Sequence, residues 1–128
     1  MAETDRLRRA PIFAGLSKHE LEVLAHHMDE LDFRPGETVI KQGGTNHAFY
    51  VIVDGQAEVS IDGTSRTLLA NGDVFGEISM EEHVPATATV AAKSALQVLV
   101  MSREQYRAVR GNDVIAHRIT DLIGKRRA

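Results

Sequence analysis

The sequence contains no cysteine, and only 3 of its 128 residues are proline. The absence of cysteine excludes disulfide bonds, thiolate metal ligands and cysteine nucleophiles. No apolar run approaches the roughly 18 residues that a membrane-spanning helix needs. The amino-terminal residues MAETDRLRR lack the apolar core of a signal peptide. A cytoplasmic protein that does not span a membrane is therefore expected.

The sequence also lacks a strong charge and the common catalytic motifs. Its net charge is −3, which argues against a surface built to bind nucleic acid or anionic membrane. Of the six histidines, no two are spaced two apart, as a jelly-roll metal enzyme would require. Neither a G-x-S-x-G motif nor a Walker-type phosphate loop is present. We expect no enzyme, no metal site and no cofactor.

An amphipathic helix is predicted near the amino terminus. Ser17 and Glu20 have the spacing of a capping box. Apolar residues then recur at helical intervals: Leu21, Leu24, Ala25, Met28 and Leu31. The helical segment is therefore expected to extend over residues 1–31, with Ile12, Phe13 and Leu16 packed beside the stripe.

Short strands are predicted from residue 33 to 101. Residues 49–53 are β-branched and aromatic, and residues 57–61 alternate between apolar and polar. Asp54-Gly55 and Asp62-Gly63 provide tight turns after these two segments. Leu96, Val98 and Val100 alternate with their neighbours in a last strand. This pattern favours an antiparallel sandwich or a closed barrel over a parallel α/β sheet.

Two further helices are predicted over residues 102–128, at about 103–110 and 113–124. Ser102 can cap the first of them. The second carries an apolar stripe that needs a cover, so these helices are expected to dock a protein partner or a second copy of the chain. The basic residues at 125–127 complement the end of a helix. We expect no DNA-binding module after the barrel.

The most informative stretch for function is residues 71–80. Gly76 allows a ligand to approach the backbone closely, and Glu77 opens a predicted helical turn. Amide groups at such a turn suit an anion, and a carboxylate suits hydroxyl groups, so a sugar phosphate fits both. Acidic residues also favour helix starts for purely structural reasons, and that alternative stays open.

The ordered motifs of the chain resemble the cyclic-nucleotide-binding domain family. The motifs that carry the resemblance span nearly the whole chain: residues 11–17, Pro35-Gly36-Glu37, Gln42-Gly43, residues 49–52 with Gly55, residues 72–77, Ala88-Thr89-Val90 and residues 102–106. The resemblance implies one domain over residues 1–128. This domain would be a mainly β, eight-stranded antiparallel jelly-roll barrel (a double-stranded β-helix) with helices at both ends and a phosphate-binding cassette at 72–90.

The resemblance also implies a binding site. Glu77 would bind the ribose hydroxyl, amides near Gly76 and Ile78 would face the phosphate or ribose, and Thr87 would lie near the phosphate. The candidate ligand-binding residues are Phe75, Gly76, Glu77, Ile78, Ser79, Ala86, Thr87 and Ala88. The implied function is a non-enzymatic regulatory module for cAMP or cGMP, with cAMP favoured.

The cassette departs from the family pattern at one important position. The family places an arginine after the cassette proline to pair with the cyclic phosphate, whereas this chain has Pro85-Ala86. Glu81 and Glu82 add negative charge nearby. Weak binding is therefore expected unless another cation replaces the arginine, for which the candidates are His83, Arg66, Lys93 and Arg103. The alternative is a degenerate domain that binds no nucleotide and acts in protein–protein interaction.

Overall fold

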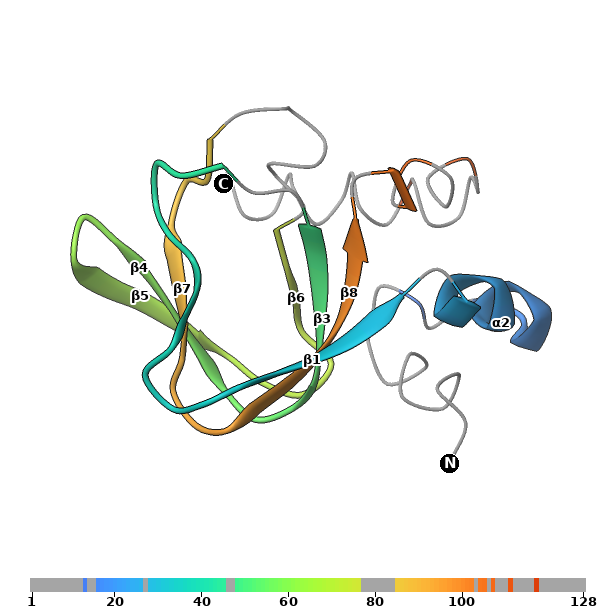
Figure 1. Ribbon diagram of the computed structural model, residues 1–128, viewed down its shortest axis with the longest axis horizontal. Helices are drawn as coiled ribbons and strands as arrows, with labels where there is room; N and C mark the ends of the chain where they lie inside the picture. Colours follow the sequence, from blue (N-terminus) through green and yellow to red (C-terminus); the bar gives the residue numbers. More distant parts are fainter. Residues whose placement is uncertain are drawn as a thin grey trace.

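The computed structural model of the chain describes residues 13, 16–26, 28–45, 48–76, 85–102, 104, 105, 107, 111 and 117. Helix α2 (Lys18–His26) precedes a series of strands (Figure 1). The strands are β1 (Asp29–Phe33), β2 (Thr38–Ile40), β3 (Ala48–Asp54), β4 (Ala57–Ile61), β5 (Thr64–Leu69), β6 (Val74–Phe75), β7 (Thr89–Ala92) and β8 (Leu96–Ser102).

The described strands form two four-stranded antiparallel sheets. One sheet has the order β1-β8-β3-β6 and the other β2-β7-β4-β5. The pairing is nested, because β1 pairs with β8, β2 with β7, and β3 with both β6 and β8. Figure 1 shows the sheets meeting at their lower end and separating toward the upper end. The jelly-roll barrel that the resemblance implied is therefore confirmed.

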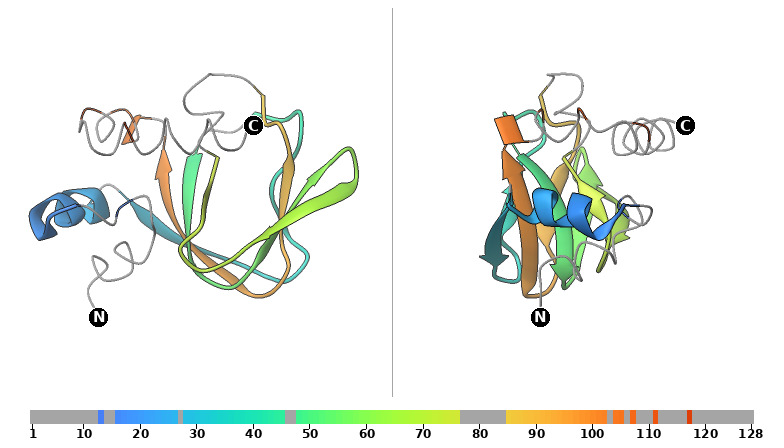
Figure 2. Two further views of the ribbon diagram at one scale, coloured as in Figure 1. Left: turned by 180° about the vertical axis from the view of Figure 1, so that it is seen from behind. Right: turned by 90° about the vertical axis from the view of Figure 1, so that its right-hand side faces the viewer.

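The sheet that contains β3 and β8 is apolar on both faces. Alternate residues of a strand face opposite sides, so Phe49 and Val51 face outward while Tyr50 and Ile52 face the barrel interior. The outer cluster comprises Phe13, Leu16, Leu21, Leu24, Met28, Phe49, Val51, Val74, Leu99 and Met101. Figure 2 shows α2 lying across this outer face. The predicted packing of Phe13 and Leu16 is confirmed, whereas Ile12 lies outside the described residues.

Helix α2 begins at the predicted capping box. The Ser17 amide donates to Glu20 Oε1 (2.9 Å), and the Glu20 amide donates to Ser17 Oγ (3.2 Å). This reciprocal pair satisfies two amides at the start of the helix. At the other end, the Met28 amide donates to the Ala25 carbonyl oxygen (3.2 Å) beyond the last helical residue.

The prediction that Leu31 continues the helical stripe is wrong. Leu31 lies in β1, where it pairs with Val98 of β8, and 45% of its surface is exposed. The chain leaves the helix after His26 and enters the sheet at Asp29, so the barrel begins before residue 33. Pairing with β8 supplies β1 with a ladder of backbone hydrogen bonds, which overrides the helical spacing of the apolar residues.

Ser102 caps the segment that follows β8, as predicted. Its amide donates to Gln105 Oε1 (2.8 Å), and the Gln105 amide donates to Ser102 Oγ (3.2 Å). Glu104, Gln105 and Arg107 are helical. Within the second predicted helix, His117 is helical. The other residues of the two predicted carboxyl-terminal helices lie outside the described residues, so their docking role stays a prediction.

Gly55 occupies the most constrained turn described. It follows β3 with φ +105°, and its amide donates to Asn71 Oδ1 (3.0 Å). A Cβ atom at this position would overlap the Ala95 carbonyl oxygen and approach Leu96 Cα to 3.0 Å. Glycine is therefore required both by the backbone angle and by the close approach of β8.

We predict that Gly55→Ala destabilises the domain more than Gly63→Ala does. Gly63 shares a positive φ of +79°, but a Cβ atom there would meet nothing within 4 Å. The positive φ alone should lower the free energy of unfolding by about 1 kcal/mol at Gly63, whereas overlap with Ala95 should raise the loss at Gly55 to about 3 kcal/mol. Urea unfolding of both variants measures the difference, and equal losses would contradict the packing argument.

Candidate functional site

The structure describes five of the candidate ligand-binding residues. Phe75 is the last residue of β6, and Gly76 follows it. Ala86, Thr87 and Ala88 directly precede β7. Glu77, Ile78 and Ser79 lie outside the described residues, as do Glu81, Glu82 and His83. β6 runs antiparallel to β3, and β7 runs antiparallel to β4, so Gly76 and residues 86–88 lie at the same end of the barrel. This end is the upper end in Figure 1.

The backbone of Ala86 is bound on both sides by the turn that follows β2. The Gly43 amide donates to the Ala86 carbonyl oxygen (2.8 Å), and the Ala86 amide donates to the Gly44 carbonyl oxygen (2.9 Å). The Gly44 amide in turn donates to the Lys41 carbonyl oxygen (3.0 Å), which closes the turn. We call the two hydrogen bonds of Ala86 the Ala86 clamp. The clamp fixes the backbone of residue 86 without using its side chain.

The side chain of Ala86 belongs to the inner apolar cluster. Only 7% of Ala86 is exposed. The buried members of this cluster are Ile40, Ile52, Ala57, Leu69, Phe75, Ala86, Val90, Ala92, Leu96 and Val98. The structure thus brings Phe75 and Ala86 together, while Thr87 is exposed and Ala88 is half-buried. A methyl group offers neither charge nor hydrogen-bond donor, so residue 86 contributes only apolar surface to this end of the barrel.

The inward-facing side chains of β3, β4 and β8 differ in burial along the barrel. Inward-facing side chains near the Gly55 turn are fully buried: Ile52 on β3, Ala57 on β4, and Leu96 and Val98 on β8. Farther along the same three strands, the inward-facing side chains are only partly buried: Tyr50, Val59 and Val100. Partly buried apolar side chains therefore lie toward the end that carries Gly76 and Ala86, next to the buried Phe75 and Ala86.

Tyr50 was not singled out as a site residue from the sequence, although it lies inside the barrel. Its ring stacks on that of Phe75, with centroids 4.7 Å apart and planes within 9°. The two residues are paired across β3 and β6. Burial raises the pKa of Tyr50 above its ordinary value of 10.0. Because residues 49–53 are all apolar or aromatic, the sequence has no alternation there that could have assigned Tyr50 to the inner face.

We predict that Tyr50 titrates above pH 10.0. The chain has two tyrosines, so Tyr106→Phe leaves Tyr50 as the only one. Because burial disfavours tyrosinate, the folded state binds its proton more tightly than the unfolded state, and stability falls as the pH rises above the ordinary value. Ultraviolet absorbance of tyrosinate follows the titration of Tyr106→Phe. An ordinary pKa in the folded protein would contradict the burial of Tyr50.

The sequence matches one known family over the whole barrel. The family model described as "Cyclic nucleotide-binding domain" matches residues 30–113. The chain belongs to this family. The cAMP-dependent protein kinase regulatory subunit of Yarrowia lipolytica is 34% identical over 107 residues, which cover 82% of this chain and 28% of that protein. The cyclic nucleotide-binding domain described here thus spans about a quarter of the length of this relative.

Solved structures share the same fold. The structure described as "Sp-2Cl-cAMPS bound to PKAR CBD2" has a TM-score of 0.84 and 27% identity, covering 95% of this chain and 84% of that one. The regulatory subunit of a cAMP-independent protein kinase A from Trypanosoma brucei has a TM-score of 0.80 and 23% identity, covering 94% and 44%. The second likeness concerns the fold alone.

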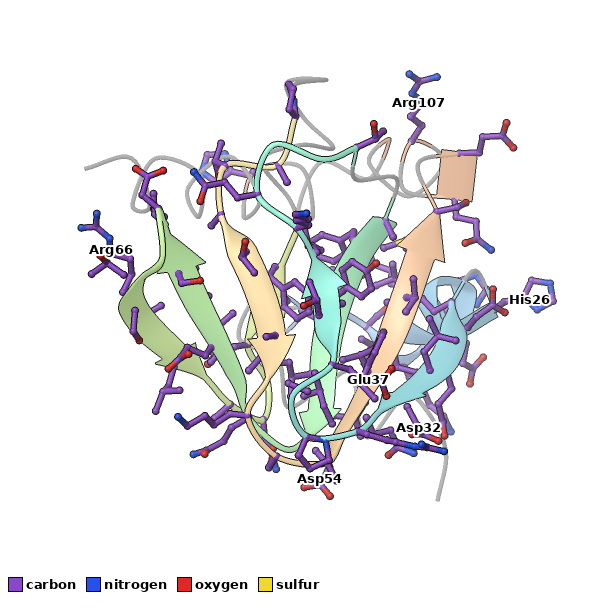
Figure 3. All side chains as sticks on the ribbon, turned by 60° about the vertical axis from the view of Figure 1, so that its left-hand side comes forward. His26, Asp32, Glu37, Asp54, Arg66 and Arg107 are labelled. Atoms are coloured by element: carbon purple, nitrogen blue, oxygen red, sulfur yellow. The ribbon has the colours of Figure 1, made fainter. Side chains whose placement is uncertain are left out.

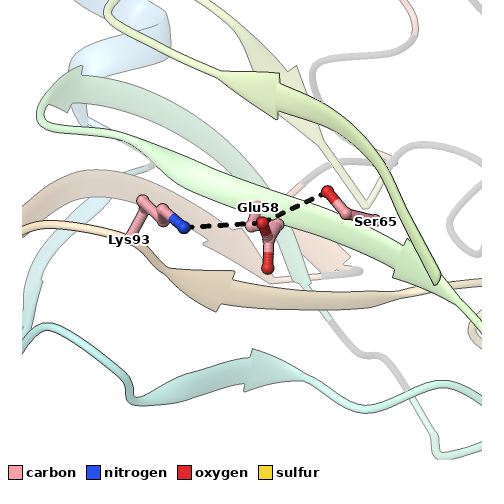
Figure 4. A network of polar contacts seen from close by, with 3 residues as sticks. All are labelled: Glu58, Ser65 and Lys93. Atoms are coloured by element: carbon pink, nitrogen blue, oxygen red, sulfur yellow. Dashed lines mark hydrogen bonds and ion pairs between the residues drawn. The ribbon is translucent and has the colours of Figure 1, made fainter. Parts of the chain in front are cut away.

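Two of the cations considered as replacements for the arginine lie away from Ala86. Lys93 follows the far end of β7, and its Nζ lies 3.7 Å from Glu58 Oε2, which also accepts a hydrogen bond from Ser65 Oγ (3.2 Å; Figure 4). The Arg66 side chain is exposed and extends outward from β5 (Figure 3). Both are surface charges of the second sheet. Arg103 and His83 lie outside the described residues.

The described part of the chain contains neither a cluster of metal-ligand side chains nor a membrane-spanning helix. Within residues 16–45, 48–76 and 85–102, apart from the undescribed His27, no three histidine, aspartate or glutamate side chains gather as metal ligands. None of the described helical residues belongs to a helix long and apolar enough to cross a membrane.

Proposed function

We propose that this chain is a non-enzymatic, cytoplasmic regulatory module that binds a cyclic nucleotide weakly, with cAMP preferred over cGMP. The observation that carries the proposal is the backbone clamp at residue 86, which is alanine, beside an inner apolar cluster that contains Phe75 and the partly buried Tyr50. The curated relatives are described as cAMP-dependent protein kinase regulatory subunits, which favours cAMP as the ligand. The ligand would enter at the end that carries Gly76 and Ala86.

The weakness follows from the chemistry of residue 86. The family resemblance places an arginine here, paired with the cyclic phosphate. A hydrogen bond to a charged group contributes about 1.5–3 kcal/mol, and a bidentate arginine lies toward the upper end. Its loss should weaken binding by roughly ten- to a hundredfold. The methyl group of Ala86 supplies no substitute donor, and Lys93 is paired elsewhere.

Other residues would retain their roles in the proposed site. Gly76 has φ +90°, an angle that glycine adopts without strain, and it carries no side chain that would stand between the backbone and a ligand. Glu77 would accept the ribose hydroxyl, and amides near Gly76 and Ile78 would face the phosphate or ribose. Thr87 is exposed near the proposed phosphate position. The ribose end of the ligand would therefore contribute more to affinity than the phosphate end.

The fold alone does not determine the ligand. The two structural neighbours have nearly equal TM-scores, yet one was solved with a cAMP analogue bound and the other is a regulatory subunit of a cAMP-independent kinase. The ligand preference of this chain is therefore argued from its side chains and not from its fold. Residue 86 is the position concerned, and its backbone is held by the Ala86 clamp.

We predict that titration calorimetry of the unmodified chain gives affinities for cAMP and adenosine within about tenfold of each other, since the phosphate meets no cation at residue 86. Affinity for cGMP should be lower than for cAMP. Glu77→Ala should abolish binding of both adenine ligands, because both carry a ribose hydroxyl. A cAMP affinity far above that of adenosine would contradict the proposed loss of phosphate recognition.

We further predict that Ala86→Arg strengthens cAMP binding by about ten- to a hundredfold and leaves adenosine binding unchanged. Ala86→Gln is the matched control, since it adds a long side chain without charge. Because residue 86 is buried, both variants should lower the unfolding temperature slightly in the absence of ligand. If neither the wild type nor a folded Ala86→Arg variant binds cAMP, cGMP or adenosine, the proposal is overturned. That result would favour a role in protein–protein interaction.

A further inference from the structure

Gln42 connects two turns that are far apart in the sequence. Its Nε2 donates to Asp62 Oδ1 (3.0 Å), and its Oε1 accepts from the Asp62 amide (2.8 Å). Asp62 lies in the turn between β4 and β5, whereas Gln42 lies in the turn after β2. Each residue donates one of these two hydrogen bonds to the other. The pair therefore restrains the relative orientation of the two turns as well as the distance between them. We call this pair the Gln42–Asp62 contact.

The same glutamine adjoins the Ala86 clamp. The Gln42 backbone amide donates to Thr89 Oγ1 (3.0 Å) at the start of β7. The next two residues, Gly43 and Gly44, make both hydrogen bonds of the clamp. Gln42 is therefore tied through its side chain to the β4–β5 turn and through its backbone to the segment that carries Ala86.

Asp62 is itself held in an unusual conformation. Its φ is +53°, the only positive φ of a non-glycine residue in the described part of the chain. Aspartate and asparagine tolerate this conformation better than most side chains. In this turn, the amide and the carboxylate of Asp62 both meet the carboxamide of Gln42. The positive φ of Asp62 thus accompanies an arrangement in which both its amide and its carboxylate reach Gln42.

We propose that Gln42 is a positioning residue for the ligand site, acting through the Gln42–Asp62 contact and the Ala86 clamp. The contact orients the turn at residues 41–44. Through the Ala86 clamp, this turn fixes the direction in which the side chain of residue 86 points. The proposal rests on the proposed function in so far as residue 86 meets the ligand. It predicts energetic coupling between residues 42 and 86, although their side chains make different contacts.

The first test measures the clamp itself and needs no ligand. Amide hydrogen exchange should show Ala86 and Gly43 less protected by about threefold or more in Gln42→Ala and in Asp62→Gly. Glycine keeps the positive φ while removing the carboxylate. Asp62→Asn retains an oxygen acceptor and should preserve protection. Gln97→Ala is the matched control, because it removes a glutamine–carboxylate hydrogen bond to Glu30 (2.7 Å) in the other sheet.

The second test measures coupling to the ligand. Ala86→Arg is introduced with Gln42 intact, with Gln42→Ala and with Gln97→Ala, and cAMP affinity is measured for each. The gain from the arginine should fall at least about threefold in the Gln42→Ala background and stay unchanged in the Gln97→Ala background. An equal gain in all three backgrounds, or unchanged exchange of Ala86, would overturn the positioning role.

The two proposals fail in different ways. If Ala86→Arg gains no cAMP affinity with Gln42 intact, the proposed function fails, and hydrogen exchange still decides whether Gln42 holds the clamp. If Ala86→Arg gains affinity irrespective of residue 42, the proposed function stands and the positioning role fails. Circular dichroism confirms that each variant is folded before its exchange and affinity are compared.

Discussion

Strands β3 and β8 carry apolar side chains on both faces, and the architecture depends on covering both. The outer face is covered by α2 and the residues beside it, including Phe13 and Leu16. The inner face is covered by the second sheet, which supplies Ile40, Ala57 and Val90. Neither cover replaces the other, because successive residues of a strand face opposite sides. A helix on one side and a closed barrel on the other are therefore consequences of the same two strands.

The inner cluster is not buried evenly, and the candidate site lies toward partly buried members of it. Ile52, Ala57 and Val98 are fully buried, whereas Tyr50 and Val100 are partly buried. Fold and candidate site are thus linked by strand direction, which brings Gly76 and Ala86 to one end of the barrel.

Local patterns predicted the fold well, and contacts between distant residues were not predictable in this way. Ser17 and Glu20 cap α2 because they stand three positions apart in the chain, and the alternation of residues 57–61 identified a strand. Leu31 was placed in the wrong element, because helical spacing says nothing about the pairing of β1 with β8. The contact of Gln42 with Asp62 spans 20 residues and has no local signature. Ala86 was identified as a departure only through the family resemblance.

The Ala86 clamp separates the structural role of the backbone of residue 86 from the chemical role of its side chain. Its amide and carbonyl groups hold the chain in place, and the side chain takes no part in those hydrogen bonds. A different side chain at such a position need not break the hydrogen bonds that hold the backbone, although burial of the side chain gives each exchange a cost in stability. Under the proposed function, a single substitution at residue 86 would therefore move the domain from recognising a neutral molecule to recognising an anion, or back again. The barrel would then act as a stable platform on which new ligand preferences evolve.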